Sequence, residues 1–133
     1  MSARKFMLYF FLEILVTITV IALFRSIDDR RLAGLWAGGL FLGFGILFLW
    51  DLWRHGRAWR TLSFWLVMAH LGFTTIPMLV VRLWNWENGF HQVRVWGIPG
   101  PLFHVTAERV FAGLMMATLL DAIYQGWRRH LRG

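Results

Sequence analysis

The 133-residue sequence contains no cysteine, and only 16% of its residues are charged. The lack of cysteine excludes disulfides, thiolate-ligated metals and iron–sulfur clusters. A soluble domain has roughly a quarter of its residues charged, so this shortage, with a hydrophobic content of 58%, argues against a water-soluble fold. HExxH, G-x-S-x-G and phosphate-binding glycine loops are also missing. The sequence therefore favours a non-enzymatic protein and predicts no cofactor.

Long apolar runs dominate what remains. Crossing a bilayer takes about 20 apolar residues, and four stretches qualify: 6–24, 35–53, 62–81 and 102–127. Pro77 is expected to kink or end the third helix. Residues 82–101 form the longest connection, an outer loop with the turn signal ENG and a Gly- and Pro-rich end. The sequence predicts a single all-α membrane domain over residues 1–133, a bundle of four transmembrane helices.

Lysine and arginine near the ends of the spans predict the orientation, because cytoplasmic loops carry more of them. Eight lie on the side of the termini and six on the other side. The first set is Arg4, Lys5, Arg54, Arg57, Arg60, Arg128, Arg129 and Arg132; the second is Arg25, Arg30, Arg31, Arg82, Arg94 and Arg109. The difference places both termini in the cytoplasm, and we expect a bacterial cytoplasmic (inner) membrane.

The net charge of +7 and the nine tryptophans raise the question of nucleic-acid binding. The basic residues flank apolar spans instead of forming one stripe, and the tryptophans fall near the predicted membrane interfaces, where they form an aromatic belt. No nucleic-acid partner is therefore expected. Juxtamembrane basic segments attract anionic lipid, which makes such lipid a candidate partner of Arg54, Arg57, Arg60, Arg128, Arg129 and Arg132.

The second span is rich in glycine. It contains two G-x-x-x-G spacings on different faces, Gly34/Gly38 and Gly39/Gly43, and also Gly45. Small residues let helix backbones approach closely in a membrane. Such a helix suits a central position in the bundle, or one that touches both its own bundle and another subunit. Gly113 and Ala117 form a weaker small-residue site in the fourth span.

Three ionisable residues lie deep inside the spans, where charge is expensive and marks a candidate functional site. At about 1.5 Å per residue, Glu13, His70 and Asp121 lie at similar depths, about 9–12 Å from the cytoplasmic end. Tyr9 and Thr17 share a helix face with Glu13, and Thr118 shares one with Asp121. This predicted intramembrane polar cluster has three interpretations: structural pairing, contact of Glu13 with a partner subunit, or proton and cation handling.

The remaining histidines give weaker signals. His104 and Glu108 are four residues apart on the outer side, with His91 nearby, but a metal site needs at least three ligands. No metal is predicted, and a lid or docking surface explains these outer-face residues better. A haem held between two histidines would need a pair at matched depth, which this chain alone does not offer.

Three functions follow from these patterns. The leading hypothesis is a non-catalytic subunit of a homo-oligomer or of a larger membrane complex, with other membrane subunits or copies of itself as partners. The second is a small proton- or cation-coupled channel or transporter that uses Glu13, His70 and Asp121. The third is a haem-binding or intramembrane enzyme subunit.

Overall fold

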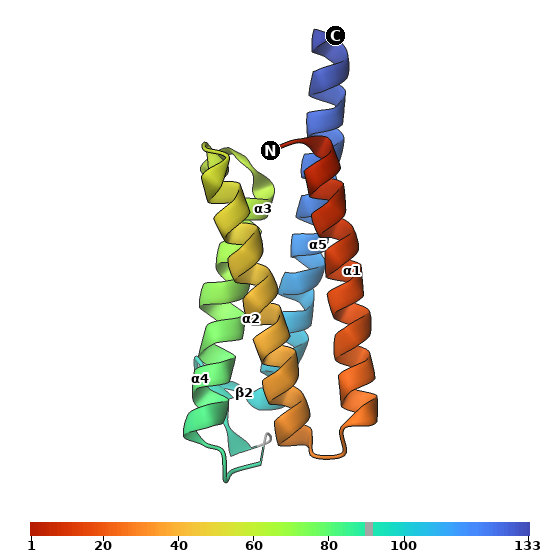
Figure 1. The fold of residues 1–133 in the computed structure, drawn as a ribbon. Helices are drawn as coiled ribbons and strands as arrows, with labels where there is room; N and C mark the ends of the chain where they lie inside the picture. The colour runs from red at the N-terminus through yellow and green to blue at the C-terminus, as the bar shows by residue number, and fades with distance from the viewer. Residues whose placement is uncertain (90–91) are drawn as a thin grey trace.

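The structure is a computed structural model, and it describes residues 1–89 and 92–133. Helices make up almost all of it (Figure 1). The elements in chain order are α1 (Ala3–Ser26), α2 (Arg30–Arg54), η1 (Ala58–Arg60), α3 (Leu62–Ala69), η2 (His70–Thr75), α4 (Ile76–Trp84), β1 (Arg94–Val95), β2 (Ile98–Pro99) and α5 (Gly100–Arg132).

The helices run antiparallel in sequence order, and α3, η2 and α4 follow one another as a single rod (Figure 1). Both termini lie at one end of the bundle, called here the terminal end. The α1–α2 connection and the hairpin before α5 lie at the opposite end, called the loop end (Figure 1). Helix α1 packs on α2 and α5, and the rod packs on α2 and α5. The arrangement is an up-and-down four-helix bundle.

Four helical segments are long and apolar enough to cross a membrane: Ala3–Ser26, Arg30–Arg54, Leu62–Trp84 and Gly100–Arg132. They confirm the predicted number of helices and suggest an integral membrane protein. Each is longer than predicted, most of all α5, which continues to Arg132 and extends past the rest of the bundle (Figure 1). The prediction ended where the apolar run ends, but a helix can continue into polar residues, and basic side chains near its C-terminus favour it.

Pro77 was expected to kink or end the third helix, and the helix does not end there, because α4 continues from Ile76 to Trp84. A proline has no N–H, so the carbonyl four residues earlier loses its helical donor. That carbonyl belongs to Phe73, and it accepts a hydrogen bond from the Trp96 indole Nε1 at 3.0 Å. The turn before Pro77 widens into the π-helical segment η2, in which the Ile76 N–H donates to Leu71 O. The helix therefore continues because its geometry and a distant side chain replace the missing bond.

The hairpin at the loop end supplies that side chain. Strands β1 and β2 pair antiparallel, Val95 opposite Ile98. The two residues between them, Trp96 and Gly97, both have positive φ, 56° and 75°. Two-residue hairpins favour this conformation, but a non-glycine residue adopts it at a cost. The Trp96 ring stacks on Phe73 with the planes 6° apart, so the strained residue is held by its contact with the rod.

The two ends of the bundle are packed differently. At the terminal end, large side chains are completely or almost completely buried: Phe6, Phe48, Leu52, Val67 and Leu114. Toward the loop end, Phe103 of α5 is also completely buried, but none of the residues Ile76–Trp84 of α4 is buried. The rod is therefore less tightly packed toward the loop end, where a cavity lies.

Candidate functional site

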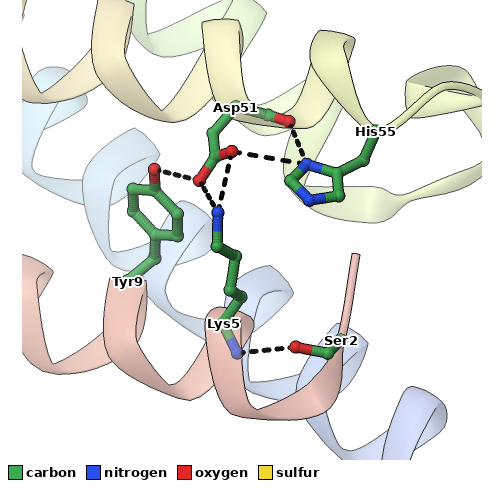
Figure 2. A network of polar contacts seen from close by, with 5 residues as sticks. All are labelled: Ser2, Lys5, Tyr9, Asp51 and His55. Carbon is green, nitrogen blue, oxygen red and sulfur yellow. Dashed lines mark hydrogen bonds and ion pairs between the residues drawn. The ribbon is translucent and has the colours of Figure 1, made fainter.

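Asp51 is the centre of a polar network at the terminal end (Figure 2). Its carboxylate accepts two hydrogen bonds from Lys5 Nζ, at 3.0 and 2.9 Å, and one from the Tyr9 hydroxyl at 2.6 Å. His55 Nδ1 lies 3.3 Å from Oδ1 of the same carboxylate and 2.7 Å from the Asp51 carbonyl. The network ties α1 to α2 and engages Tyr9, which the sequence had placed in the cluster around Glu13.

Asp121 accepts hydrogen bonds from the start of α3. Oδ2 accepts from the Ser63 N–H at 2.8 Å and from the Ser63 hydroxyl at 2.6 Å, while Oδ1 accepts from the Leu62 N–H at 3.3 Å. The first N–H groups of a helix have no partner within it, and a carboxylate is favoured there. Asp121 therefore caps α3 from α5 and joins the two helices.

Glu13 lies in the bundle interior with no exposed surface. Its Oε1 accepts a hydrogen bond from the Thr118 hydroxyl at 2.7 Å, and Thr17 donates to its main-chain carbonyl at 2.9 Å. Oε2 is buried and has no hydrogen-bond partner among residues 1–89 and 92–133. The structure thus brings Glu13 and Thr118 together, whereas within the described residues no hydrogen bond or ion pair joins Glu13 to His70 or Asp121.

His70 is buried at the start of η2 and has only long polar contacts. Its Nε2 lies 3.4 Å from the Phe41 carbonyl and 3.3 Å from the Thr75 hydroxyl. The ring packs against Phe41 and Phe111, with centroid distances of 5.6 and 5.3 Å. π-Helical turns are frequent at functional sites, and here the turn places His70 and Thr75 at the inner end of a cavity.

This central cavity has a volume of about 350 Å³. Helix α1, helix α2, the η2–α4 part of the rod and helix α5 all contribute to its walls. Its lining residues are Thr17, Val20, Ile21, Phe24, Gly34, Ala37, Gly38, Phe41, His70, Thr74, Thr75, Met78, Leu79, Arg82, His104, Ala107, Glu108, Phe111, Ala112 and Met115. A volume of roughly 300–1,000 Å³ is typical of small-molecule sites, which makes this cavity the candidate functional site.

The polar groups of the central cavity divide into two ends. At the inner end the hydroxyls are already engaged: Thr74 donates to the His70 carbonyl at 2.6 Å, and Thr17 donates to Glu13 O. At the loop end the cavity reaches Arg82 and an ion pair between His104 Nε2 and Glu108 Oε1 at 2.9 Å. Apolar side chains separate the two ends. Formal charge is thus confined to the mouth of the cavity.

The glycines of α2 have two different surroundings. A Cβ on Gly34 would overlap Arg82 Nη1, and one on Gly38 would overlap Leu79 of α4. A Cβ on Gly45 would come within 2.5 Å of Leu71. A Cβ on Gly39 or Gly43, by contrast, would meet nothing within 4 Å. The face of α2 with Gly34, Gly38 and Gly45 thus packs against the rod. The face with Gly39 and Gly43 points away from the bundle.

The other predicted residues have simpler positions. Gly113 lies near Leu66, with 3.4 Å from a Cβ to Cδ1, and Ala117 is buried. His104 and Glu108 form the ion pair at the cavity mouth. His91 lies outside the described residues. Over residues 1–89 and 92–133, no group of three or more His, Asp or Glu side chains could hold a metal ion.

Sequence reasoning missed Asp51 and Arg82 as members of polar sites. Both stand near a helix end, where a charged residue is usually explained by the nearby interface. A signal for Asp51 exists, since Lys5 lies at the same predicted end of the neighbouring helix. Arg82 gives no such signal, because the residue that accommodates it is a glycine.

Comparison with known proteins yields no match: no protein-family model, curated protein or solved structure is significantly similar to this chain. The function is therefore argued from the geometry of the site.

Proposed function

We propose that this protein is an integral membrane protein that binds an amphipathic small molecule in the central cavity. The observation that carries the proposal is the cavity itself, about 350 Å³, which is lined by all four helical rods of the bundle and is partly open to the outside. Protein interiors normally have few voids larger than a water molecule. A space of this size in so small a bundle is best explained by an occupant.

The distribution of polar groups supports binding over catalysis. The walls are mainly apolar, and charge is found at the mouth, near Arg82. The carboxylates Asp121 and Glu13 do not orient His70, because Asp121 is engaged with Ser63 and Glu13 with Thr118. His70 contacts Thr75 only at 3.3 Å or more. This arrangement suits a molecule with an apolar body and one polar end.

The proposal is tested by filling the cavity. Ala112 lines it from an exposed position on α5, and Ala112→Phe places an aromatic ring at the open side of the space. Ala22 is exposed on α1 and does not line the cavity, so Ala22→Phe is the matched control. The bound small molecules are extracted from the purified proteins and identified by mass spectrometry. We expect a ligand in the parent protein and in Ala22→Phe, and its loss from Ala112→Phe. A parent protein without any stoichiometric ligand contradicts the proposal.

A second function is a non-catalytic subunit of a homo-oligomer or a larger membrane complex. The observation that favours it is the outward face of α2, where Gly39 and Gly43 have open space around them. Small residues on an exposed helix face allow close approach of another helix. Gly39→Leu should therefore dissociate an assembly seen by native mass spectrometry, without destabilising the monomer. An unchanged oligomeric state in Gly39→Leu and Gly43→Leu would remove this argument.

We also propose that both termini face the cytoplasm, from the excess of eight basic residues over six. The lack of cysteine makes the test simple, because one introduced thiol is the only one present. Ser2→Cys should be protected from a membrane-impermeant maleimide in intact cells, and Asn88→Cys should react. The reverse labelling pattern would invert the orientation.

A further inference from the structure

A small pocket adjoins the loop end of the central cavity; its walls are mainly apolar, and it is called here the polar pocket for the two arginines that line it. Its volume is about 30 Å³, while a single water needs about 10–15 Å³, so it has room for only a small chemical group. Its lining residues are Arg31, Leu35, Leu79, Arg82, Asn85, Trp86, Asn88 and Val93. Leu79 and Arg82 line the central cavity as well. The two spaces are therefore neighbours that share the Leu79 and Arg82 side chains as lining.

The polar pocket has the chemistry of an anion site. Two guanidinium groups line it, Arg31 from the start of α2 and Arg82 from the end of α4. Arg31 is positioned by its own contacts: Nη1 donates to the Trp86 carbonyl at 3.0 Å, and its Cζ lies 5.6 Å from the Trp86 ring centroid. Its Nε also lies 4.0 Å from Oδ1 of the exposed Asp29. Guanidinium groups bind carboxylate and phosphate through charge-assisted hydrogen bonds.

Gly34 determines where Arg82 lies. A Cβ at position 34 would overlap Arg82 Nη1, so the guanidinium occupies the space that a side chain of α2 would otherwise fill. Arg82 is thereby placed against α2, between the polar pocket and the central cavity. Of the Gly34/Gly38 pair, Gly34 accommodates the charged group of Arg82, whereas Gly38 accommodates the apolar side chain of Leu79.

The central cavity beyond Arg82 is suited to hydrocarbon. Its middle is lined by apolar side chains from three helices, among them Ile21, Met78, Phe111 and Met115. Along the rod the lining extends from Arg82 to His70, twelve residues or about 18 Å at 1.5 Å per residue. At the far end the Thr17 and Thr74 hydroxyls donate to backbone carbonyls, so an apolar chain end leaves them satisfied.

We propose that the two spaces together bind an amphipathic anion. The anionic head, a carboxylate or a phosphate, lies in the polar pocket between Arg31 and Arg82, and one hydrocarbon chain extends through the central cavity toward His70. The inference rests on the proposed function and deepens it by naming the ligand class. A fatty acid and an anionic phospholipid share this chemistry. The site lies at the loop end, opposite the basic segments of the terminal end that the sequence pointed to for anionic lipid.

The test measures binding of three probes by native mass spectrometry of the protein in a neutral detergent. The probes are palmitate, phosphatidylglycerol and phosphatidylcholine, the last two with identical chains. We expect at least one anionic probe to bind about ten-fold more tightly than phosphatidylcholine, which corresponds to about 1.4 kcal/mol. Arg82→Gln and, separately, Arg31→Gln should abolish that preference. Arg109→Gln removes a charge from an exposed residue near the same end that lines neither space, and it should change nothing.

The variants separate failure of the ligand class from failure of the site. Ala112→Phe should weaken all three probes, while Ala22→Phe should not. A preference for anions that survives both Arg31→Gln and Arg82→Gln overturns the proposed head-group site and leaves the cavity proposal standing. Equal binding of all probes to the parent protein and Ala112→Phe overturns both. A preference for palmitate alone supports a fatty acid as the ligand, and one for phosphatidylglycerol alone supports a phospholipid.

Discussion

The terminal and loop halves of the bundle are built from the same four helical rods but differ in what fills the space between them. In the terminal half, aromatic rings fill it: Tyr9 stacks on Phe48 at 4.2 Å, and Phe44 packs beside both. In the loop half, α2 and α5 present small residues inward, among them Ala37 and Ala107. These cannot reach across the bundle. The difference shows that one helical arrangement can provide both a rigid support and a binding space.

The difference between the halves predicts unequal effects of truncating a side chain. Phe48 is completely buried in the terminal half, and Phe48→Ala should lower the free energy of unfolding by about 3–5 kcal/mol. Met78 lines the cavity, where part of its surface already meets empty space. Met78→Ala should therefore lower the free energy of unfolding by less than about 2 kcal/mol, below the usual range for Met→Ala. Denaturant titration in detergent, followed by circular dichroism, measures both. Equal losses would mean that the two halves are packed alike.

Polar contacts reinforce the terminal half in the same way. Asp51→Asn removes the charge that accepts two hydrogen bonds from Lys5 and one from Tyr9. Hydrogen bonds to charged groups contribute about 1.5–3 kcal/mol, and Lys5 is partly exposed, so we expect a loss of about 2 kcal/mol in the free energy of unfolding. Asp29→Asn is the control, because its ion pair with Arg31 is exposed and 4.0 Å long, and it should lose less than about 1 kcal/mol. Similar losses in the two variants would contradict a special role for the Asp51 network.

The helices could be predicted from the sequence more easily than the spaces between them. Apolar runs long enough to cross a bilayer identify the four helices without any knowledge of packing, because each helix satisfies its own backbone hydrogen bonds. Depth along a span follows from the 1.5 Å rise, and it placed Glu13, His70 and Asp121 at one level. Depth does not say which way a side chain points around the helix axis, and the structure pairs Glu13 with Thr118 and Asp121 with Ser63.

The cavity could not be predicted from the sequence for a related reason. It results from small residues on separate helices that face one another, which no local pattern in the sequence reveals. The replacement of the missing Pro77 bond by Trp96 is likewise a contact between residues far apart in the chain. The two glycine faces of α2 were visible from their spacing, but only the packed helices show that Gly34 accommodates Arg82 and that Gly39 is open.

In the loop half, the contact between Trp96 and Phe73 can be isolated by a double-mutant cycle. Trp96→Phe removes the Nε1 donor to Phe73 O and retains an aromatic ring, so we expect a loss of about 1 kcal/mol in the free energy of unfolding. Pro77→Ala restores a backbone N–H that can donate to the same carbonyl. In the Pro77→Ala background, Trp96→Phe should therefore have a smaller effect. Additive losses would show that the indole and the missing helical bond are independent.

Glu13 is the exception in the well-packed terminal half, because its Oε2 is buried and no residue that the structure describes forms a hydrogen bond with it. Glu13→Leu removes this oxygen at similar volume, and Thr118 keeps the Leu114 carbonyl as acceptor at 2.8 Å. Replacing a buried polar group whose partner remains satisfied can be neutral or stabilising, so the free energy of unfolding should stay equal or rise by up to about 1 kcal/mol. A clear loss would show that Oε2 has a partner in the membrane.

Glu13→Gln distinguishes a structural role of Glu13 from a role in proton transport. If Glu13 handles protons, this variant should lose proton flux in liposomes while it stays folded; unchanged flux, or none in the parent protein, leaves Glu13 a structural contact of Thr118.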